Sequence, residues 1–240
     1  MKQATVLAFV SGAAAAATTT LPASAGVTSE PTAIPVSGEL DGGMMRYERD
    51  PPVCEGEGET GEDAAMFILE DGATLSNVIL GASQAEGVHC KGTCTLNNVW
   101  WADVCEDAAT FWQESGTSYV NGGGAFHAAD KVFQFNGRGT VVIGDFYAND
   151  YGKVVRSCGN CDDNGGPRNV VIEDSVAVDG GPLCGINTNY GDTCQVSNTC
   201  QNEGESCELY EGNANGDEPT KIGEGPDGES CVVSNLTEDC

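Results

Sequence analysis

The chain has 240 residues, and its 37 Asp and Glu residues against 10 Lys and Arg residues give a formal net charge of −27. This excess of negative charge excludes a general nucleic-acid binder and a protein that binds anionic membrane surfaces, because both need a basic face. A protein of this charge either avoids anionic partners or meets them through a bridging cation.

Residues 1–25 have the layout of a secretory signal peptide. Lys2 supplies the charged start, residues 6–17 form a short apolar stretch, and Ala23-Ser24-Ala25 offers a cleavage site between small residues. A membrane anchor is disfavoured, since the apolar stretch is too short to span a bilayer. We therefore predict a secreted, extracellular protein whose remaining ~215 residues form one domain with tails.

The 12 cysteines support this prediction, because an even number in a secreted chain is typical of a disulfide framework. The pair Cys158 and Cys161 could instead belong to a metal or redox motif. However, the chain has only two histidines and no second CxxC motif to complete a zinc site. Disulfide pairing is not readable from sequence; Cys90 with Cys105 and Cys158 with Cys161 are the two candidate pairs that we name.

Three segments follow the signal peptide. Residues 26–34 are rich in Thr, Ser and Pro without an apolar period and are predicted to be a linker. Residues 35–200 are rich in Gly and Asn with short β-branched runs, and they form the predicted folded domain. Residues 201–240 are acidic and poor in apolar residues, which indicates a disulfide-tied coil or a disordered appendage. Asn235 begins an N-glycosylation sequon.

A short strand motif recurs along the central segment. Residues 73–80 (ATLSNVIL) are echoed 21 residues later by residues 94–101 (CTLNNVWW). One position of the motif always holds Asn or Asp, which tolerate the left-handed backbone angles of a tight bend. That position is occupied by Asn77, Asn98, Asp145, Asp174 and Asn198.

A repeat of strand, polar corner and strand predicts stacked coils, because one coil alone cannot bury its inward aliphatic side chains. The gap between Asn98 and Asp145 is two coils long and holds a middle strand at residues 130–135 (DKVFQF). This spacing favours an all-β, right-handed parallel β-helix over a sandwich of independent hairpins.

Carboxylates concentrate at one corner of the predicted β-helix. Asp103, Glu106 and Asp107 lie at the end of one strand and in the following bend, and Glu86 lies one coil earlier. Stacked coils are about 4.8 Å apart, so these side chains can converge. A hard, oxygen-seeking cation such as Ca²⁺ would relieve their mutual repulsion. The alternative is a solvated acidic rim.

The few positive charges are also clustered. Of the nine that follow the signal peptide, five lie between positions 131 and 168. Lys131 opens its strand, and Arg156 ends a strand one coil further on, so stacking would bring this pair close to the acidic corner. The alternative is a set of ordinary surface ion pairs, which contribute little to stability.

Residues 67–200 resemble the pectate lyases of polysaccharide lyase family 3, found in plant-associated microbes. The resemblance is carried by five segments in the family's order: 67–75 (FILEDGATL), 85–92 (AEGVHCKG), 104–109 (VCEDAA), 152–161 (GKVVRSCGNC) and 185–192 (GINTNYGD). It implies a parallel β-helix, dependence on Ca²⁺, and cleavage of polygalacturonate by β-elimination. It also implies a pectate partner of plant cell walls, no nucleic acid, no membrane, and a monomer.

The resemblance extends to individual residues. Asp103, Glu106, Asp107 and Glu86 are similar to the family's calcium ligands. Lys131 resembles the base that removes a proton from the sugar, and Arg156 resembles the residue that binds the substrate carboxylate. The further substrate-binding candidates are Lys153, Arg138, Lys91 and Trp112.

Two positions depart from the family pattern. Trp112 stands where a lysine is expected, and Ala102 stands where an acid is usual. These departures keep open a catalytically weakened pectate-binding or defence-eliciting relative, in which Trp112 stacks on a sugar face. A purely structural, cysteine-rich secreted protein is the second alternative.

Overall fold

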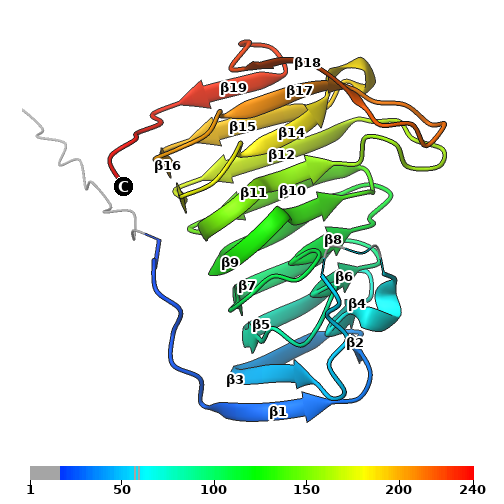
Figure 1. Cartoon of the computed structure of the whole chain (residues 1–240), viewed down its shortest axis with the longest axis vertical. Helices are drawn as coiled ribbons and strands as arrows, with labels where there is room; N and C mark the ends of the chain where they lie inside the picture. The colour runs from blue at the N-terminus through cyan, green and yellow to red at the C-terminus, as the bar shows by residue number, and fades with distance from the viewer. Residues whose placement is uncertain (1–16, 57, 59) are drawn as a thin grey trace, which may run out of the picture.

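A computed structural model describes residues 17–56, 58 and 60–240, in which the strands of successive coils stack along one axis (Figure 1). The predicted signal peptide lies outside the described residues up to position 16, and residues 17–25 form no helix or strand. In the described part of the chain, no helical segment has the length and apolarity that a membrane crossing requires.

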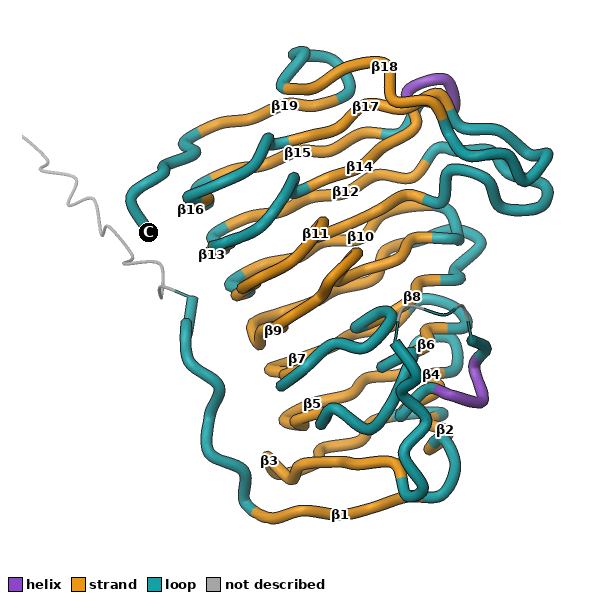
Figure 2. Tube along the Cα trace, viewed as in Figure 1, coloured by secondary structure: helices purple, strands orange, loops and turns teal. Residues whose placement is uncertain are grey.

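The fold is a right-handed parallel β-helix, as the strand repeats predict. The strands are β1 (Gly26–Glu30), β2 (Ile34–Val36), β3 (Glu39–Arg49), β4 (Phe67–Leu69), β5 (Ala73–Leu80), β6 (Val88–Cys90), β7 (Cys94–Trp101), β8 (Ala109–Phe111), β9 (Thr117–Phe135), β10 (Gly139–Gly144), β11 (Tyr147–Ser157), β12 (Arg168–Glu173), β13 (Val176–Val178), β14 (Cys184–Asn187), β15 (Thr193–Ser197), β16 (Cys200–Gln201), β17 (Cys207–Glu211), β18 (Thr220–Gly225) and β19 (Cys231–Ser234). Two 3-10 helices, η1 (Glu62–Ala64) and η2 (Thr188–Tyr190), lie with several loops at one side of the stack (Figure 2).

The core is a set of aliphatic columns that run along the stack. In one column, each residue is the parallel-strand partner of the next, so equivalent positions of successive coils superpose. Its members are Leu40, Leu75, Leu96, Val120, Ile143, Ile172, Val196 and Val233. Only the stack as a whole removes these side chains from water, which is why the motif must recur.

The polar corner of the motif is a left-handed residue in every predicted coil. Asn77, Asn98, Asp145, Asp174 and Asn198 all have φ between 49° and 54°. Asn98 Nδ2 donates to Asn77 Oδ1 at 2.8 Å, so the corners also stack through their side chains. In β9 the corner falls on Gly122, with φ of 66°, which explains why the sequence motif is not visible there.

The linker predicted at residues 26–34 is wrong, because β1 and β2 belong to the sheet. Gly26 of β1 pairs in parallel with Met45 of β3, and Ile34 of β2 pairs with Phe67 of β4. Successive β1 residues are alternately half-buried and exposed. Such an edge coil has only one neighbour to pack against, so its sequence lacks the apolar period of an inner coil.

The predicted irregular tail is likewise corrected, since residues 201–240 contain β17, β18 and β19. The strand β19 pairs in parallel with β15, and β17 pairs in parallel with β14. Strand β18 runs antiparallel to β17 and forms a hairpin with it. The apolar core here is small, with Leu209 among its members and Val233 packed against it, and disulfides and main-chain pairing add to it, so an apolar pattern did not reveal this end of the helix.

All cysteines are paired, and none of those described is free. Of the two candidate pairs, Cys158–Cys161 is confirmed and Cys90–Cys105 is wrong. Cys90 is the last residue of β6 and forms a disulfide with Cys94 across the next corner. Cys105 forms a disulfide with Cys54, in the loop between β3 and β4. The disulfides are Cys54–Cys105, Cys90–Cys94, Cys158–Cys161, Cys184–Cys194, Cys200–Cys240 and Cys207–Cys231.

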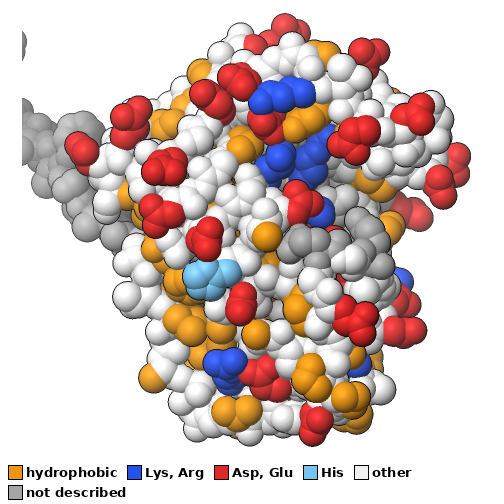
Figure 3. Space-filling view, viewed as in Figure 1, with side chains coloured by type: hydrophobic (Ala, Val, Ile, Leu, Met, Phe, Trp, Pro, Cys, Tyr) orange, Lys and Arg blue, Asp and Glu red, His pale blue; other side chains and the backbone are white. Residues whose placement is uncertain are grey.

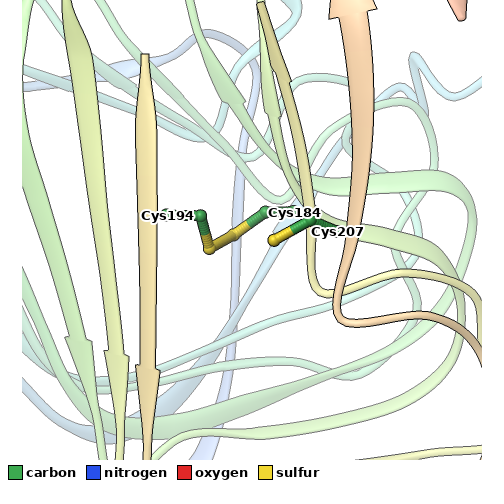
Figure 4. A group of neighbouring side chains, drawn as sticks. All are labelled: Cys184, Cys194 and Cys207. Atoms are coloured by element: carbon green, nitrogen blue, oxygen red, sulfur yellow. A yellow bond between two sulfur atoms is a disulfide. The ribbon is translucent and has the colours of Figure 1, made fainter. Parts of the chain in front are cut away.

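Three of these cysteines, Cys184, Cys194 and Cys207, lie close enough together to resemble a metal site. Figure 4 shows that two of them are joined to each other, and the third is bonded to Cys231. A sulfur held in a disulfide is not a thiolate ligand, so this group is structural.

Candidate active site

Three of the four predicted carboxylates converge at one place. One oxygen from each of Glu86, Glu106 and Asp107 lies within 4.8 Å of the others, and all three residues are at most 4% exposed. Glu86 precedes β6 and the other two precede β8, so the group spans two stacked coils. Asp103 is exposed and lies outside this acidic triad. Its corner lies beside β9, because the amide of Val104 donates to the carbonyl of Phe126.

Gly87 allows the two loops of the acidic triad to stack closely. It has φ of 57°, and a Cβ atom added there would lie 1.9 Å from the carbonyl oxygen of Ala108. A side chain would therefore push the coil that carries Glu86 away from the coil that carries Glu106 and Asp107.

Lys131 neutralises part of the acidic triad. Its Nζ lies 3.3 Å from Glu106 Oε1, 3.2 Å from Asp107 Oδ1 and 2.9 Å from Asp130 Oδ2. The residue is on β9, in the coil after the triad, and is 7% exposed. The structure thus places the predicted base directly against the predicted metal ligands.

The pKa values of this cluster reflect burial and charge together. Burial would lower the pKa of Lys131, but the carboxylates of Asp107, Glu106 and Asp130 outweigh that effect and raise it. Burial raises the pKa of Asp107, and the charge of Lys131 opposes the rise. The nearest charged neighbours of Lys131 are acids, so the lysine is protonated here.

A second set of cations lies one coil further on. Lys153 of β11 is the parallel partner of Lys131, and Arg156 is the partner of Gln134. Figure 3 shows Lys and Arg side chains gathered in the upper half of one face, among Asp and Glu side chains. Arg156 Nη2 is buried and has no hydrogen-bond partner in the described part of the chain, although Nη1 donates to the carbonyls of Ser157 and Gly185.

Two adjoining cavities connect these groups. The first lies over the acidic triad and is also lined by Lys131, Lys91 and Trp112. The second is lined by Lys153, Arg156 and Tyr210. Both share Lys131 and Gln134, so Lys131 stands between the carboxylates and the other cations. Such an arrangement suits a polymeric ligand that crosses several coils.

Of the three remaining predicted substrate-binding residues, Lys91 and Trp112 line the first cavity and Arg138 does not. Lys91 is ion-paired with Glu62 at the rim of the first cavity, and Trp112 is 45% exposed over it. Arg138 lines neither cavity. Its Nη1 donates to the carbonyls of Asn136 and Gly137, which makes it a support for the corner after β9.

Several site residues were not predicted. His89 Nε2 lies 3.2 Å from Glu86 Oε2, and Thr60 Oγ1 donates to Glu86 Oε1 at 2.7 Å. The segment 85–92 carried a signal for His89, one of only two histidines in the chain. Glu208 and Tyr210 lie in the segment predicted to be a tail, where no repeat signalled their position.

The acidic triad fits a hard cation such as Ca²⁺. Its donors are all carboxylate oxygens, the type that Ca²⁺ prefers, and they are gathered and buried before any ion binds. Asp107 Oδ1 has no hydrogen-bond partner among the described residues and forms an ion pair with Lys131 Nζ. The lysine ammonium thus supplies the positive charge that a bound cation would otherwise supply.

Replacement of the lysine tests this balance. Lys131→Met is expected to lower the free energy of unfolding by about 3 kcal/mol in chelator, because it leaves buried carboxylates without their cation. Lys131→Met/Asp107→Asn should recover part of the loss. The control is Lys91→Met, which breaks an exposed ion pair and should change stability by less than about 1 kcal/mol. Chemical denaturation measures all three, and an unchanged Lys131→Met would contradict the predicted compensation.

Comparison with known proteins supports the predicted family. A family model described as pectate lyase matches residues 18–217. A probable pectate lyase F of Aspergillus terreus is 50% identical over 186 residues, which cover 77% of this chain and 79% of that protein. Pectate lyase E of Emericella nidulans is 47% identical over 222 residues, which cover 92% of this chain and 86% of that protein.

Solved structures agree. The catalytic domain of pectate lyase PelI from Erwinia chrysanthemi is 30% identical with a TM-score of 0.71, covering 89% of this chain and 97% of that domain. PelI from Erwinia chrysanthemi in complex with tetragalacturonic acid is 32% identical with a TM-score of 0.72, covering 85% of this chain and 68% of that one. By the extent of these matches and the shared β-helix, the chain belongs to the pectate lyase family and is an enzyme of that family.

Proposed function

We propose that this pectate lyase is a secreted monomer that cleaves de-esterified polygalacturonate by calcium-assisted β-elimination. The observation that carries the proposal is the row of acidic triad, buried lysine and partly buried arginine across four successive coils. The complex of PelI with tetragalacturonic acid supports a galacturonate substrate. The signal-peptide layout of residues 1–25 supports secretion.

The reaction needs positive charge near the substrate carboxylate. Removal of the C5 proton puts negative charge on the carbon next to that carboxylate; the C4–O bond then breaks as the C4–C5 double bond forms. Arg156 would bind the carboxylate through its buried Nη2, which makes no hydrogen bond to any described residue. Ca²⁺ held by Glu86, Glu106 and Asp107 would act as a Lewis acid on the same carboxylate.

Lys131 would accept the C5 proton. An amine is a base only in its neutral form, and the carboxylates of Asp107, Glu106 and Asp130 raise the pKa of this lysine. The lysine therefore loses its proton more readily when other positive charge balances those carboxylates. This requirement supports a dependence on divalent cation and a rate that rises toward alkaline pH.

The remaining rim residues would hold the polymer. Lys153 is partly exposed beside Arg156 and can meet the carboxylate of a neighbouring sugar. Lys91 would contribute positive charge at the opposite rim, where it is paired with Glu62. The ring of Trp112 offers a face for stacking on a sugar. With base, arginine and carboxylates all present, the geometry favours an active enzyme over a weakened pectate-binding relative.

The lyase assay tests the base. Absorbance from unsaturated product should grow on polygalacturonate with Ca²⁺, cease in chelator, and rise in rate with pH. Lys131→Ala is expected to lower kcat by about 10²- to 10⁴-fold, the usual contribution of a general base. The control is Arg46→Ala, on β3 and outside both cavities. A Lys131→Ala enzyme with the full rate would show that another group takes the proton.

A second measurement concerns the aromatic rim. Trp112→Ala is expected to raise KM roughly three- to tenfold and to leave kcat nearly unchanged, because stacking holds substrate and transition state alike. Tyr119→Ala is the matched control, since Tyr119 is 43% exposed on β9 and lines neither cavity. Equal KM values for Trp112→Ala and the wild type would remove Trp112 from the substrate site.

A further inference from the structure

The hairpin of β17 and β18 reaches the cation side of the candidate site. Arg156 of β11 is the parallel partner of Gly185 of β14, which is the partner of Glu208 of β17. These residues form a surface column that continues from Gln134 of β9. Pro219, next to the start of β18, lines the same cavity as Arg156 and Lys153. The segment that looked like a tail is therefore a wall of the site.

Gly185 leaves the space that lets the cations reach this wall. A Cβ atom added there would lie 2.7 Å from Arg156 Cδ and 3.3 Å from Lys153 Cδ. Both long side chains thus lie across a position that has no side chain of its own. They extend past β14 to contact the residues of β17.

Two residues of β17 make those contacts. The guanidinium of Arg156 lies over the ring of Tyr210, with Cζ 4.0 Å from the ring centroid. Lys153 Nζ lies 3.2 Å from Glu208 Oε2, and the same oxygen accepts a hydrogen bond from the Tyr210 hydroxyl at 2.6 Å. Lys221 of β18 contacts the other oxygen, Glu208 Oε1, at 2.6 Å. Glu208 is therefore the centre of a network that includes both substrate-binding cations.

Glu208 stays ionised in this network. Burial would raise its pKa, but the hydrogen bonds from Lys221 and Tyr210 and the charge of Lys153 lower it to about 2. The residue therefore remains an anion across the pH range in which the enzyme would act. An arginine that stacks on a ring keeps its hydrogen-bonding edge free, and Arg156 Nη2 has no hydrogen-bond partner among the residues that the structure describes.

We propose that Tyr210 and Glu208 are positioning residues that hold Arg156 and Lys153 in place to receive two uronate carboxylates. The inference rests on the proposed function and deepens it. The ring of Tyr210 fixes the plane of the guanidinium, and Glu208 holds the ammonium of Lys153 beside it. The hairpin thereby sets the spacing of the two cations along the bound polymer.

Substitution of the Tyr210 ring distinguishes the positioning of Arg156 from a purely structural role of Tyr210. Tyr210→Leu is expected to lower kcat/KM on polygalacturonate about tenfold, whereas Tyr210→Phe keeps the ring and should stay within about threefold of the wild type. In an Arg156→Lys background, Tyr210→Leu should cost less than about threefold, because the residue acts through the guanidinium. Thermal unfolding of each variant checks that the β-helix is intact.

Substitution of the acid provides a matched pair. Glu208→Gln is expected to lower kcat/KM about tenfold, because Lys153 loses a charged partner. Glu224→Gln makes the same chemical change on the same hairpin, where the side chain is exposed and contacts Lys221, and should leave kcat/KM unchanged.

The outcomes distinguish this inference from the proposed function. If Tyr210→Leu and Glu208→Gln keep the wild-type kcat/KM while Arg156→Ala loses activity, the hairpin has no positioning role and the proposed function stands. Equal losses for Tyr210→Leu in the Arg156 and Arg156→Lys backgrounds would likewise overturn the inference. If the wild type gives no unsaturated product, or Arg156→Ala is fully active, the proposed function itself fails.

Discussion

The interaction on which the site depends is the attraction between three buried carboxylates and a positive charge. Glu86, Glu106 and Asp107 are almost fully withdrawn from water and lie within reach of a single ion. Left alone, they would repel one another and take up protons. Lys131 relieves the repulsion, but only as an ammonium ion, in which form it is not a base. In the proposed mechanism, the contacts that neutralise the carboxylates would therefore make the activity depend on another cation.

The parallel β-helix produces this arrangement through its register. Because equivalent residues of successive coils superpose, side chains far apart in sequence form straight rows on the surface. One such row consists of Gln134, Arg156, Gly185 and Glu208, which are partners in successive parallel strands. In the proposed binding mode, a polymer that lies across the coils would meet the acidic triad, Lys131 and the cations of the next coil in order. Because the chain has a net charge of −27, a bridging cation would reduce its repulsion of a polyanion.

The features that follow from the strand repeat could be predicted from the sequence. The polar corners at Asn77 and Asn98 identified the coils, and their spacing correctly indicated that Glu86 would meet the acids of the next coil. The prediction failed at the ends of the solenoid, because edge strands pack on one side only and disulfides supplement a smaller apolar core there. Tyr210 lay in such a segment and carried no signal. Asp103 looked like a further ligand because sequence proximity does not reveal which way a corner turns.

The most direct test of this account is calorimetric titration of metal-free protein with Ca²⁺ in the absence of substrate. The account predicts one site in the wild type, tighter binding in Lys131→Met because the ammonium no longer competes, and loss of binding in Asp107→Asn. Equal Ca²⁺ affinity in all three proteins would show that the ion does not bind at the acidic triad, and would contradict the electrostatic basis of the proposed mechanism.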